Sequence, residues 1–407
     1  MPMEMSYPAT DDPLLLILKL PGETCNINCY YCFEKRKPYP SAQTIEPPTL
    51  RRALQSLGNR SLDVQLHGGE PLLLGRERIR ALLAELRAYP GRLQLYLQTN
   101  GTTLTEEWFD FFDAEWPEIE IGISLDGDAA ANAHRVDYRD RPTHAQVEHA
   151  LGIAAARDRK VGLIAVATRQ SLGRAREILS YFASLPAVRN VNFSPCLDYS
   201  VKTKEFPRGN RKSLMVLNPD GQGMPGWATT PLEYADFLID LFNAWRDTGA
   251  YQRFIVEPLF SLLRTIQGQS TRFCHFSEKK CAHVLTLYPD GRIGSCDELR
   301  MPDALLTHVS MLGERADIAA LQHNSALRPG MDALLERCSK CDYQTTCRGG
   351  CLATRLSYQG TAYEEEYCHY RIRVIDYLAA AIGAPPIGHE SATAVAVAAF
   401  PPAEISH

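Results

Sequence analysis

The first half of the chain alternates between short apolar runs and amphipathic stretches. Runs rich in Val, Ile and Leu predict six strands, at residues 14–20, 63–67, 93–99, 119–125, 161–168 and 191–195. A helical period between them predicts helices at residues 47–58, 76–88, 105–116, 143–157 and 172–184. Because each of the first five strands is followed by a helix, the pattern predicts an α/β fold, a partial (β/α)6 TIM-like barrel. Such a barrel has two strands fewer than a complete one.

The periodicity changes after the sixth strand. Residues 196–230 are rich in Pro, Gly, Asn and Lys and have no clear period, which is typical of a functional or mobile segment. Helical patterns resume near residues 231–247 and 255–268. Residues 274–368 are dense in cysteine and predict an irregular domain.

The C-terminal part contains two regular signals. Pro289-Asp290-Gly291-Arg292 lies between short apolar runs and predicts a β-hairpin turn. Residues 374–382 predict a final helix, and we expect the Ala/Pro-rich tail after Pro385 to be poorly ordered. The predicted parts of the chain are an N-terminal extension (1–13), a partial barrel (14–230), a helical bridge (231–273), a Cys-rich domain (274–375) and a C-terminal helix with a flexible tail (376–407).

Composition and charge exclude some classes of function. The chain is 45% hydrophobic and 22% charged, and its formal net charge of -5 argues against a general nucleic-acid binder. Residues 1–12 do not resemble a signal peptide, and no apolar stretch is long enough to span a bilayer. We therefore expect a cytoplasmic protein without a membrane partner. The twelve cysteines then predict metal sites, because disulfides are rare in a reducing compartment.

Three cysteines follow the first predicted strand with the spacing C-x3-C-x2-C. Cys25, Cys29 and Cys32 suit three irons of a [4Fe–4S] cube, which leaves the fourth iron open to a small molecule. The alternative is a structural zinc site, which usually needs four ligands, and no fourth ligand is near in the sequence. The loop also follows a strand, where βα folds place their active sites.

The run Cys25-x3-Cys29-x-Tyr31-Cys32 resembles the signature of radical S-adenosylmethionine (SAM) enzymes, including the aromatic residue before the third cysteine. The resemblance implies an oxidoreductase in which SAM binds the open iron through its amino and carboxylate groups. It further implies that the cluster cleaves SAM to a 5′-deoxyadenosyl radical, which abstracts a hydrogen atom from the substrate.

Three further motifs resemble the segments that line the SAM pocket of this family. They are Gly68-Gly69-Glu70-Pro71, Gln98-Thr99-Asn100-Gly101 and Ser124-Leu125-Asp126-Gly127, each at a predicted strand end. The resemblance implies that Glu70 faces the SAM ammonium, and the alternative is a turn of no consequence. It also implies that Ser124 and Asp126 contact the SAM carboxylate or ribose, and the alternative for these two is a polar residue that caps a loop. Arg135 is a candidate partner of the SAM carboxylate, and the alternative is a surface arginine.

The C-terminal region holds a second group of cysteines that is far denser than chance. Eight thiolates suit two complete [4Fe–4S] clusters, but also two zinc sites, and the ligand count does not decide between them. The eight residues are Cys274, Cys281, Cys296, Cys338, Cys341, Cys347, Cys351 and Cys368.

Gly291-x4-Cys296, the run of residues 338–351 and Cys368 resemble a SPASM domain, the cluster-bearing extension of peptide- and protein-modifying radical SAM enzymes. The resemblance implies three [4Fe–4S] clusters in total. It assigns one auxiliary cluster to Cys274, Cys281, Cys296 and Cys351, and the other to Cys338, Cys341, Cys347 and Cys368. Cys196 is left over, and we favour a buried small hydrophobe over a role in the active site.

Within this group the chain resembles two kinds of enzyme. The first is the maturases of ribosomally made peptides, which oxidise side chains or join them into rings such as cyclophanes; the second is the anaerobic sulfatase-maturing enzymes, which convert Cys or Ser to formylglycine. The polar, glycine-rich residues 202–226 depart from the second kind, so we favour the first as the sequence prediction. An electron carrier is the alternative of another class, but a carrier needs no SAM pocket.

Asp297 directly follows a predicted cluster ligand. By resemblance to the sulfatase maturases it is the candidate base that takes a proton from the substrate radical, and the alternative is a residue that orients the backbone around the cluster. The expected partners are a precursor peptide or protein substrate and an electron donor such as flavodoxin or ferredoxin. Only about a dozen residues precede the first strand, so we expect any leader peptide to bind the catalytic core, residues 196–230 or a separate leader-binding protein.

Overall fold

A computed structural model describes residues 3–36, 43–196, 201–204, 214–217, 226–299, 301–385 and 387. The tail predicted after Pro385 lies almost wholly outside the described residues, and so does much of the 196–230 segment.

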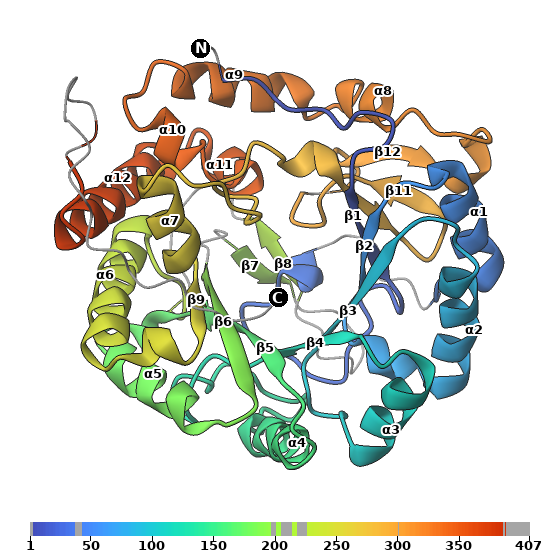
Figure 1. Ribbon diagram of the computed structural model, residues 1–407, viewed down its shortest axis with the longest axis horizontal. Helices are drawn as coiled ribbons and strands as arrows, with labels where there is room; N and C mark the ends of the chain where they lie inside the picture. The colour runs from blue at the N-terminus through green and yellow to red at the C-terminus, as the bar shows by residue number, and fades with distance from the viewer. Residues whose placement is uncertain are drawn as a thin grey trace.

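The barrel is built from parallel strands that neighbour one another in chain order. They are β1 (Leu14–Lys19), β2 (Leu62–His67), β3 (Leu93–Thr99), β4 (Glu120–Ser124), β5 (Val161–Ala167) and β6 (Val188–Pro195). The helices between them are α1 (Pro47–Leu57), α2 (Arg76–Arg87), α3 (Glu106–Glu115), α4 (His144–Ala156) and α5 (Ala175–Ser184). Figure 1 shows the helices on the outside of a curved, open sheet. The partial TIM-like barrel predicted from the alternation is therefore confirmed.

The sheet continues beyond the barrel strands at both edges. β9 (Ile255–Glu257) pairs with β6, and β10 (Val284–Leu287) pairs in parallel with β1. β11 (Arg292–Gly294) and β12 (Leu305–His308) then add antiparallel strands beyond β10. The predicted hairpin turn is thus confirmed, and the Cys-rich region shares one sheet with the barrel.

Two predictions for the C-terminal half are wrong. The helix expected over residues 255–268 is the strand β9 followed by α7 (Leu259–Ile266), because β-branched Ile255 and Val256 precede Pro258, which disfavours helix before it. The Cys-rich region is also more regular than expected. It contains α8 (Ile318–His323), α9 (Arg328–Cys338), α10 (Gln344–Cys347), α11 (Leu352–Tyr358) and the start of α12 (Tyr363–Ala381).

The largest apolar core lies between the sheet and its helices. α6 (Pro231–Asp247) packs beside α5 and α12, and buries Phe242 and Trp245 completely or nearly so. Its first turn is fixed by a capping box, in which Thr230 and Glu233 each accept a hydrogen bond from the other's backbone N–H. A second, smaller cluster lies in the Cys-rich region and includes Cys281, Cys296 and Cys351 among its partly buried members.

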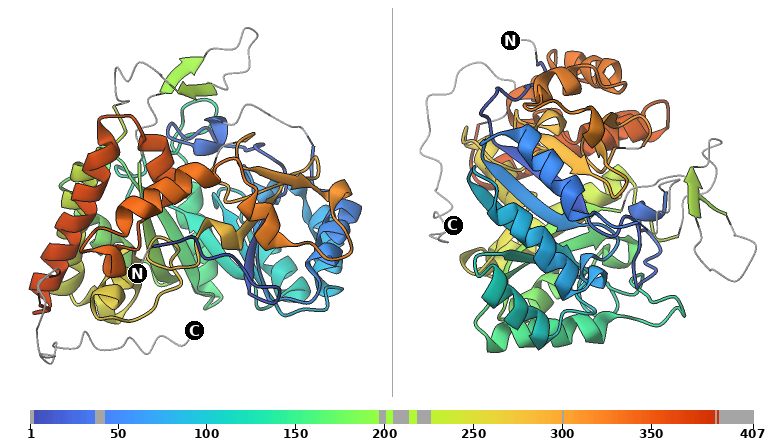
Figure 2. Two further views of the ribbon diagram at one scale, coloured as in Figure 1. Left: turned by 90° about the horizontal axis from the view of Figure 1, so that it is seen from above. Right: turned by 90° about the vertical axis from the view of Figure 1, so that its right-hand side faces the viewer.

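A small two-stranded sheet stands apart from the barrel. β7 (Val201–Lys204) and β8 (Leu214–Leu217) pair antiparallel, and β8 lies beside the short helix η1 (Phe33–Arg36). Figure 2 shows this hairpin projecting from the body of the molecule. The remaining short 3-10 helices are η2 (Pro71–Leu74), η3 (Arg169–Ser171), η4 (Ala250–Gln252), η5 (Cys281–His283) and η6 (Val309–Met311).

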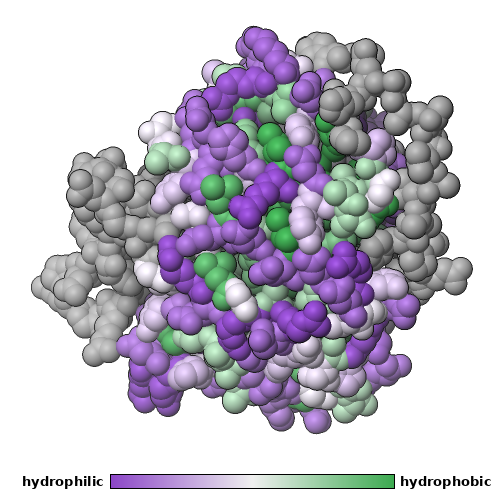
Figure 3. Space-filling view, turned by 90° about the vertical axis from the view of Figure 1, so that its left-hand side faces the viewer, coloured by the Kyte–Doolittle hydropathy of each residue, from purple (hydrophilic) through white to green (hydrophobic). Residues whose placement is uncertain are grey.

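Within the part of the chain that the structure describes, none of the helices has the length and apolar character needed to cross a membrane. The face drawn in Figure 3 is mostly hydrophilic, with only small hydrophobic patches between polar side chains.

Leu287 lies where the barrel and the Cys-rich region share one sheet, and its replacement tests that packing. It is fully buried on β10, where it pairs with Leu18 of β1 and Ile293 of β11. Leu287→Ala should lower the free energy of unfolding by about 2–5 kcal/mol, because it removes buried methyl groups and leaves a cavity. Leu305→Ala on β12 is the control, since Leu305 is 40% exposed, and it should change stability by less than about 1 kcal/mol. Equal effects in anaerobic denaturant titrations would contradict this arrangement.

Candidate active site

The Cys25–Cys29–Cys32 loop lies at the C-terminal end of β1. The backbone N–H of Asn28 donates to the carbonyl of Val136 at 2.6 Å, and that of Tyr30 donates to the carbonyl of His134 at 3.0 Å. The loop is therefore held against the segment that follows β4. Cys29 is buried, and Cys25 and Cys32 are partly buried.

Gly68 and Gly69 permit a close approach between the end of β2 and the chain just before Cys25. The N–H of Gly69 donates to the carbonyl of Gly22 at 2.8 Å, and that of Glu70 donates to the carbonyl of Thr24 at 2.9 Å. A Cβ on Gly69 would lie only 2.2 Å from the Thr24 oxygen, and Gly68 has a φ of +136°. The two glycines are thus required by backbone packing, whatever else binds there.

Glu70 lies inside the loops rather than at an open surface. Its carboxylate accepts hydrogen bonds from Leu72 N at 3.0 Å, Thr99 Oγ1 at 2.8 Å and Asn100 N at 2.7 Å. Burial raises the pKa of Glu70 to about 7, although these hydrogen bonds favour the ionised form. Glu70 therefore ties the loop after β2 to the end of β3, and its contact with SAM stays a prediction.

Asp126 joins the Cys loop to the ends of β4 and β5. It is fully buried; its Oδ1 accepts from Arg135 Nη2 at 2.9 Å and from Val166 N at 2.8 Å, and its Oδ2 accepts from the Tyr31 hydroxyl. The guanidinium of Arg135 lies 5.4 Å from the centre of the Tyr31 ring. Both oxygens of Asp126 thus have partners within the chain, and its direct role is to hold Tyr31 and Arg135 in place.

Arg135 is only 7% exposed, so the alternative of a surface arginine is wrong. Within the described residues its Nε–H is buried and makes no hydrogen bond, which is unusual for a buried donor.

Asn100 donates to Asn26 Oδ1 at 2.8 Å and to Cys25 Sγ at 3.5 Å. Ser124 accepts from Gln98 Nε2 at 3.1 Å at the end of β4. Arg135 and Asn100 thus lie against the Cys loop, as the resemblance implies for SAM-pocket residues.

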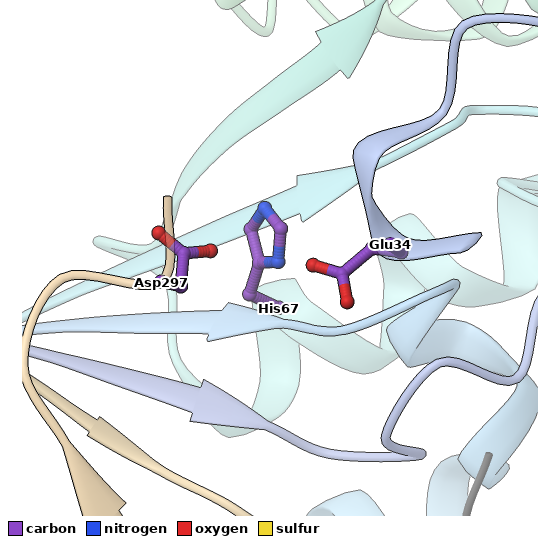
Figure 4. A group of neighbouring side chains, drawn as sticks. All are labelled: Glu34, His67 and Asp297. Atoms are coloured by element: carbon purple, nitrogen blue, oxygen red, sulfur yellow. The ribbon is translucent and has the colours of Figure 1, made fainter. Parts of the chain in front are cut away.

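Lys19, the one charged residue of β1, is the centre of a buried polar cluster. Its ammonium lies 2.5 Å from Glu34 Oε1, 2.6 Å from Asp297 Oδ2 and 3.0 Å from His67 Nδ1. Lys19 is 1% exposed. Figure 4 shows the side chains of Glu34, His67 and Asp297 gathered at one place, with His67 at the end of β2. The cluster thus joins β1, the Cys loop, β2 and the residue after Cys296.

The ammonium of Lys19 lies between two carboxylates. Burial alone would lower the pKa of Lys19, but the carboxylates of Asp297 and Glu34 outweigh it and hold the pKa above its ordinary value. Since an ammonium only donates, Nδ1 of His67 is the acceptor, and a neutral ring carries its proton on Nε2. Ligand atoms of Glu34, His67 and Asp297 lie within 4.8 Å of one another, a spacing that suits a metal ion. The Lys19 ammonium already supplies the positive charge there, so we assign no metal to this cluster.

The eight C-terminal cysteines fall into two spatial sets. Burial raises the pKa of the Cys281 thiol to about 12, and the nearby Cys351 and Cys274 add to that rise; Cys281 and Cys351 likewise add to the raised pKa of Cys296. In the second set, the nearby Cys338 and Cys347 add to the raised pKa of the Cys341 thiol and of the Cys368 thiol. The structure thus brings together the same two sets of four that the resemblance assigns to two clusters, while ligation itself stays a prediction.

The spacing of the sulfur atoms argues against zinc. A tetrahedral zinc ion with Zn–S bonds of about 2.3 Å places its sulfurs about 3.8 Å apart. Across the described residues, the only group of three or more ligand atoms that all lie within 4.8 Å is Glu34, His67 and Asp297. Among the described residues, no three cysteine sulfurs therefore meet as closely as the ligands of one bound zinc ion.

Cys196 is 2% exposed and lies in a small apolar cluster with Ile27, Cys29 and Tyr31. Burial agrees with the favoured interpretation of a small hydrophobe, and its place beside Cys29 puts it next to the Cys loop.

Sequence reasoning missed Lys19, Glu34 and His67 as members of one site. The available signal was a lone lysine in an otherwise apolar strand, which predicts a buried partner.

Lys19 provides a stability test of the cluster. Lys19→Met leaves the carboxylates of Glu34 and Asp297 buried without their cation, and it should lower the free energy of unfolding by about 3–5 kcal/mol. Lys279→Met is the matched control, because Lys279 is 52% exposed and lies 3.5 Å from Asp12; its loss should cost less than about 1 kcal/mol. Anaerobic denaturant titrations would measure both, and equal values would contradict a buried ionised pair.

The chain is similar to known proteins over most of its length. The family model of the Radical SAM superfamily matches residues 20–181. The serine-type anaerobic sulfatase-maturating enzyme of Bacteroides thetaiotaomicron is 23% identical over 373 residues, which cover 86% of this chain and 86% of that protein. The cysteine-type enzyme of Clostridium perfringens is 24% identical over 367 residues, covering 87% of this chain and 93% of that one.

A solved structure agrees with the computed fold. Native anSMEcpe with bound AdoMet and the Cp18Cys peptide has a TM-score of 0.71 and 24% identity, over 90% of this chain and 96% of that chain. The likeness extends over the barrel and the Cys-rich region together. These findings favour the sulfatase-maturing alternative over the ribosomal-peptide prediction made from the sequence. The chain therefore contains a radical SAM domain, over residues 20–181, followed by a cysteine-rich C-terminal region.

Proposed function

We propose that this enzyme oxidises the side-chain carbon of a Cys or Ser residue in a peptide or protein substrate to the aldehyde of formylglycine. The observation that carries the proposal is the position of Asp297, a buried carboxylate that directly follows Cys296 and meets the Cys25–Cys32 loop through Lys19. The similarity to both serine-type and cysteine-type sulfatase-maturating enzymes supports it.

Three sets of residues are proposed to hold the cofactors. Cys25, Cys29 and Cys32 would hold the cluster that binds SAM, with the unpartnered Nε–H of Arg135 available to a ligand carboxylate. The two C-terminal sets of four cysteines would hold the auxiliary clusters, with four thiolates for each. When bound, SAM and its cluster supply a radical that abstracts a hydrogen atom from carbon.

Asp297 is proposed to take the proton that the substrate loses. Conversion of Ser to formylglycine removes two hydrogens from the side chain, one as a hydrogen atom and one as a proton with an electron. Conversion of Cys also exchanges sulfur for an oxygen of water. Lys19 holds Asp297 in the cluster, and His67 and Glu34 offer neighbouring groups to which a proton can pass. A one-electron carrier such as flavodoxin or ferredoxin would serve as electron partner.

Maturation of a ribosomally made peptide is the second candidate. The observation in its favour is the hairpin of β7 and β8, built by the polar segment that distinguished this chain in the sequence, with β8 beside η1. An extended peptide pairs readily with an exposed strand, and a separate leader-binding protein would be a further partner of such an enzyme.

The two candidates differ in a direct assay. Anaerobically reconstituted protein, SAM and a reductant should convert a sulfatase-derived peptide containing Cys or Ser to an aldehyde, measured by mass spectrometry and by trapping with a hydrazine reagent. The variant with Cys25, Cys29 and Cys32 replaced by Ala is the control; it should lose about a third of the iron, all 5′-deoxyadenosine and all product. Release of 5′-deoxyadenosine with no aldehyde from either peptide would refute formylglycine formation and favour another peptide substrate.

Asp297→Asn separates hydrogen abstraction from proton removal. The variant keeps the shape of the side chain but cannot accept the proton, so product should fall by about a hundredfold or more. A deuterium label on the target carbon should still reach 5′-deoxyadenosine, and iron content should stay unchanged. Asp290→Asn is the matched control, because Asp290 pairs only with Arg292 in the exposed hairpin turn. Normal product from Asp297→Asn, with iron intact, would remove Asp297 from the mechanism.

A further inference from the structure

Two buried arginines point their N–H groups at cysteine sulfurs of the outer set, defined as Cys338, Cys341, Cys347 and Cys368. Arg371 Nε donates to Cys347 Sγ at 2.9 Å, and Arg355 Nη1 donates to Cys338 Sγ at 2.9 Å. Arg371 is 4% exposed and Arg355 is 5% exposed. The two arginines come from different helices, α12 and α11, so the outer set receives a donor from each of two sides.

These arginines are built into the fold rather than placed on its surface. Arg371 also donates from Nη2 to the Cys347 carbonyl at 2.9 Å, and its guanidinium lies 4.6 Å from the centre of the Phe276 ring. Arg355 also donates to the Gly349 carbonyl at 3.3 Å. A Cβ on Gly350 would lie 2.3 Å from the Tyr367 hydroxyl and 3.1 Å from Arg371 Nε, so the turn between Cys347 and Cys351 packs against both side chains.

A buried guanidinium requires a nearby negative charge. For Arg371 the strongest favourable charge comes from Cys347, and for Arg355 it comes from Cys338. The fold therefore places a cationic N–H donor against each of these two sulfurs. A ligand sulfur of an iron–sulfur cluster carries negative charge, so these contacts support the fit of the outer set to such a cluster.

The inner set, defined as Cys274, Cys281, Cys296 and Cys351, has a different environment. Its buried cation, Lys280, donates to the carbonyls of Cys274 at 3.0 Å and Gly350 at 3.1 Å rather than to a sulfur. The carboxylates of Asp297 and Glu298 add to the raised pKa of Cys296, whereas the Lys280 ammonium opposes the rise at Cys274 and Cys281. The two sets thus differ in their direct donors: arginine N–H groups contact two outer sulfurs, while the inner set has two carboxylates near Cys296 and a lysine that donates to carbonyls.

We propose that Arg355 and Arg371 raise the reduction potential of a cluster held by the outer set above that of a cluster held by the inner set. Hydrogen bonds to cluster sulfurs and nearby positive charge stabilise the reduced, more negative state, whereas carboxylates oppose it. The two arginines are positioning and tuning residues of the outer site. The inference rests on the proposed ligation by these cysteines, but not on which peptide residue the enzyme oxidises.

Neutral variants of the two arginines test this inference. In anaerobic redox titrations followed by EPR, Arg355→Gln and Arg371→Gln should each shift the outer cluster to a lower potential, and the double variant should shift it further. The outer cluster is identified as the signal lost in Cys341→Ala. The signals of the other two clusters should not move, and iron content should match that of the unmodified protein.

Arg348→Gln is the matched control. It removes the same charge directly after Cys347, but the Arg348 side chain is 34% exposed and pairs with Glu278 at 2.6 Å. Because water and salt screen an exposed charge, this variant should leave every potential unchanged. An equal shift in Arg348→Gln would show that net charge, not the buried N–H donors, sets the potential, and would overturn the inference.

A second measurement covers variants that lose iron. In the unmodified protein exchanged into D2O, pulsed EPR of the reduced outer cluster should detect exchangeable deuterons at the distance of an N–H···S contact. Their absence, or unchanged potentials in both Gln variants with full iron content, would overturn the inference. Full iron in both sets without oxidation of any Cys or Ser peptide would contradict only the proposed function. Absence of iron from the outer set in the unmodified protein would defeat both.

Discussion

The ammonium of Lys19 is the contact through which the separate parts of this active site meet. It joins the end of β1 to Glu34 after the third cysteine of the loop, to His67 before the Gly68-Gly69 turn, and to Asp297 after Cys296. Two carboxylates and an imidazole in a buried space are unfavourable without a cation, and one ammonium satisfies all three. The position of Asp297, on which the proposed proton removal depends, therefore follows from a residue at the start of the barrel.

Continuity of the sheet gives this contact its rigidity. β10 pairs with β1 along four residues, so the loop that carries Cys296 and Asp297 begins from the same sheet that carries the Cys25 loop. A Cys-rich domain attached by a flexible linker would leave the distance from Asp297 to Lys19 undefined. Here the Asp297 segment leaves β11 and the Cys25 loop leaves β1, with β10 between these two strands, so the barrel and the Cys-rich region are parts of one sheet.

Local polar side chains in the barrel loops serve mainly to fix one loop against another. Glu70 accepts three hydrogen bonds from the loops after β2 and β3, and Asp126 holds Tyr31, Arg135 and Val166. Glu70 and Asp126, which the resemblance assigns to SAM binding, thus also hold the loops around the Cys loop in place. Asn100 donates to Cys25 Sγ, and the guanidinium of Arg135 lies over the Tyr31 ring of that loop.

The sequence alone predicted the barrel, the Cys loop and the density of the C-terminal cysteines, because each depends on residues close together in the chain. Periodicity within about ten residues specifies a strand or a helix, and three thiols within eight residues necessarily share a loop. It failed at residues 255–257, where a three-residue strand is too short for its period to be seen.

The tertiary structure alone decided which side chains share a site. Lys19 and Asp297 are 278 residues apart, and Arg371 and Cys347 are 24 apart, so no local pattern relates them. Their contacts arise because β10 docks on β1 and because α12 runs past the Cys347 turn. A short spacing in the sequence keeps two residues near each other. Only the packing of the helices and strands determines which buried charges contact one another.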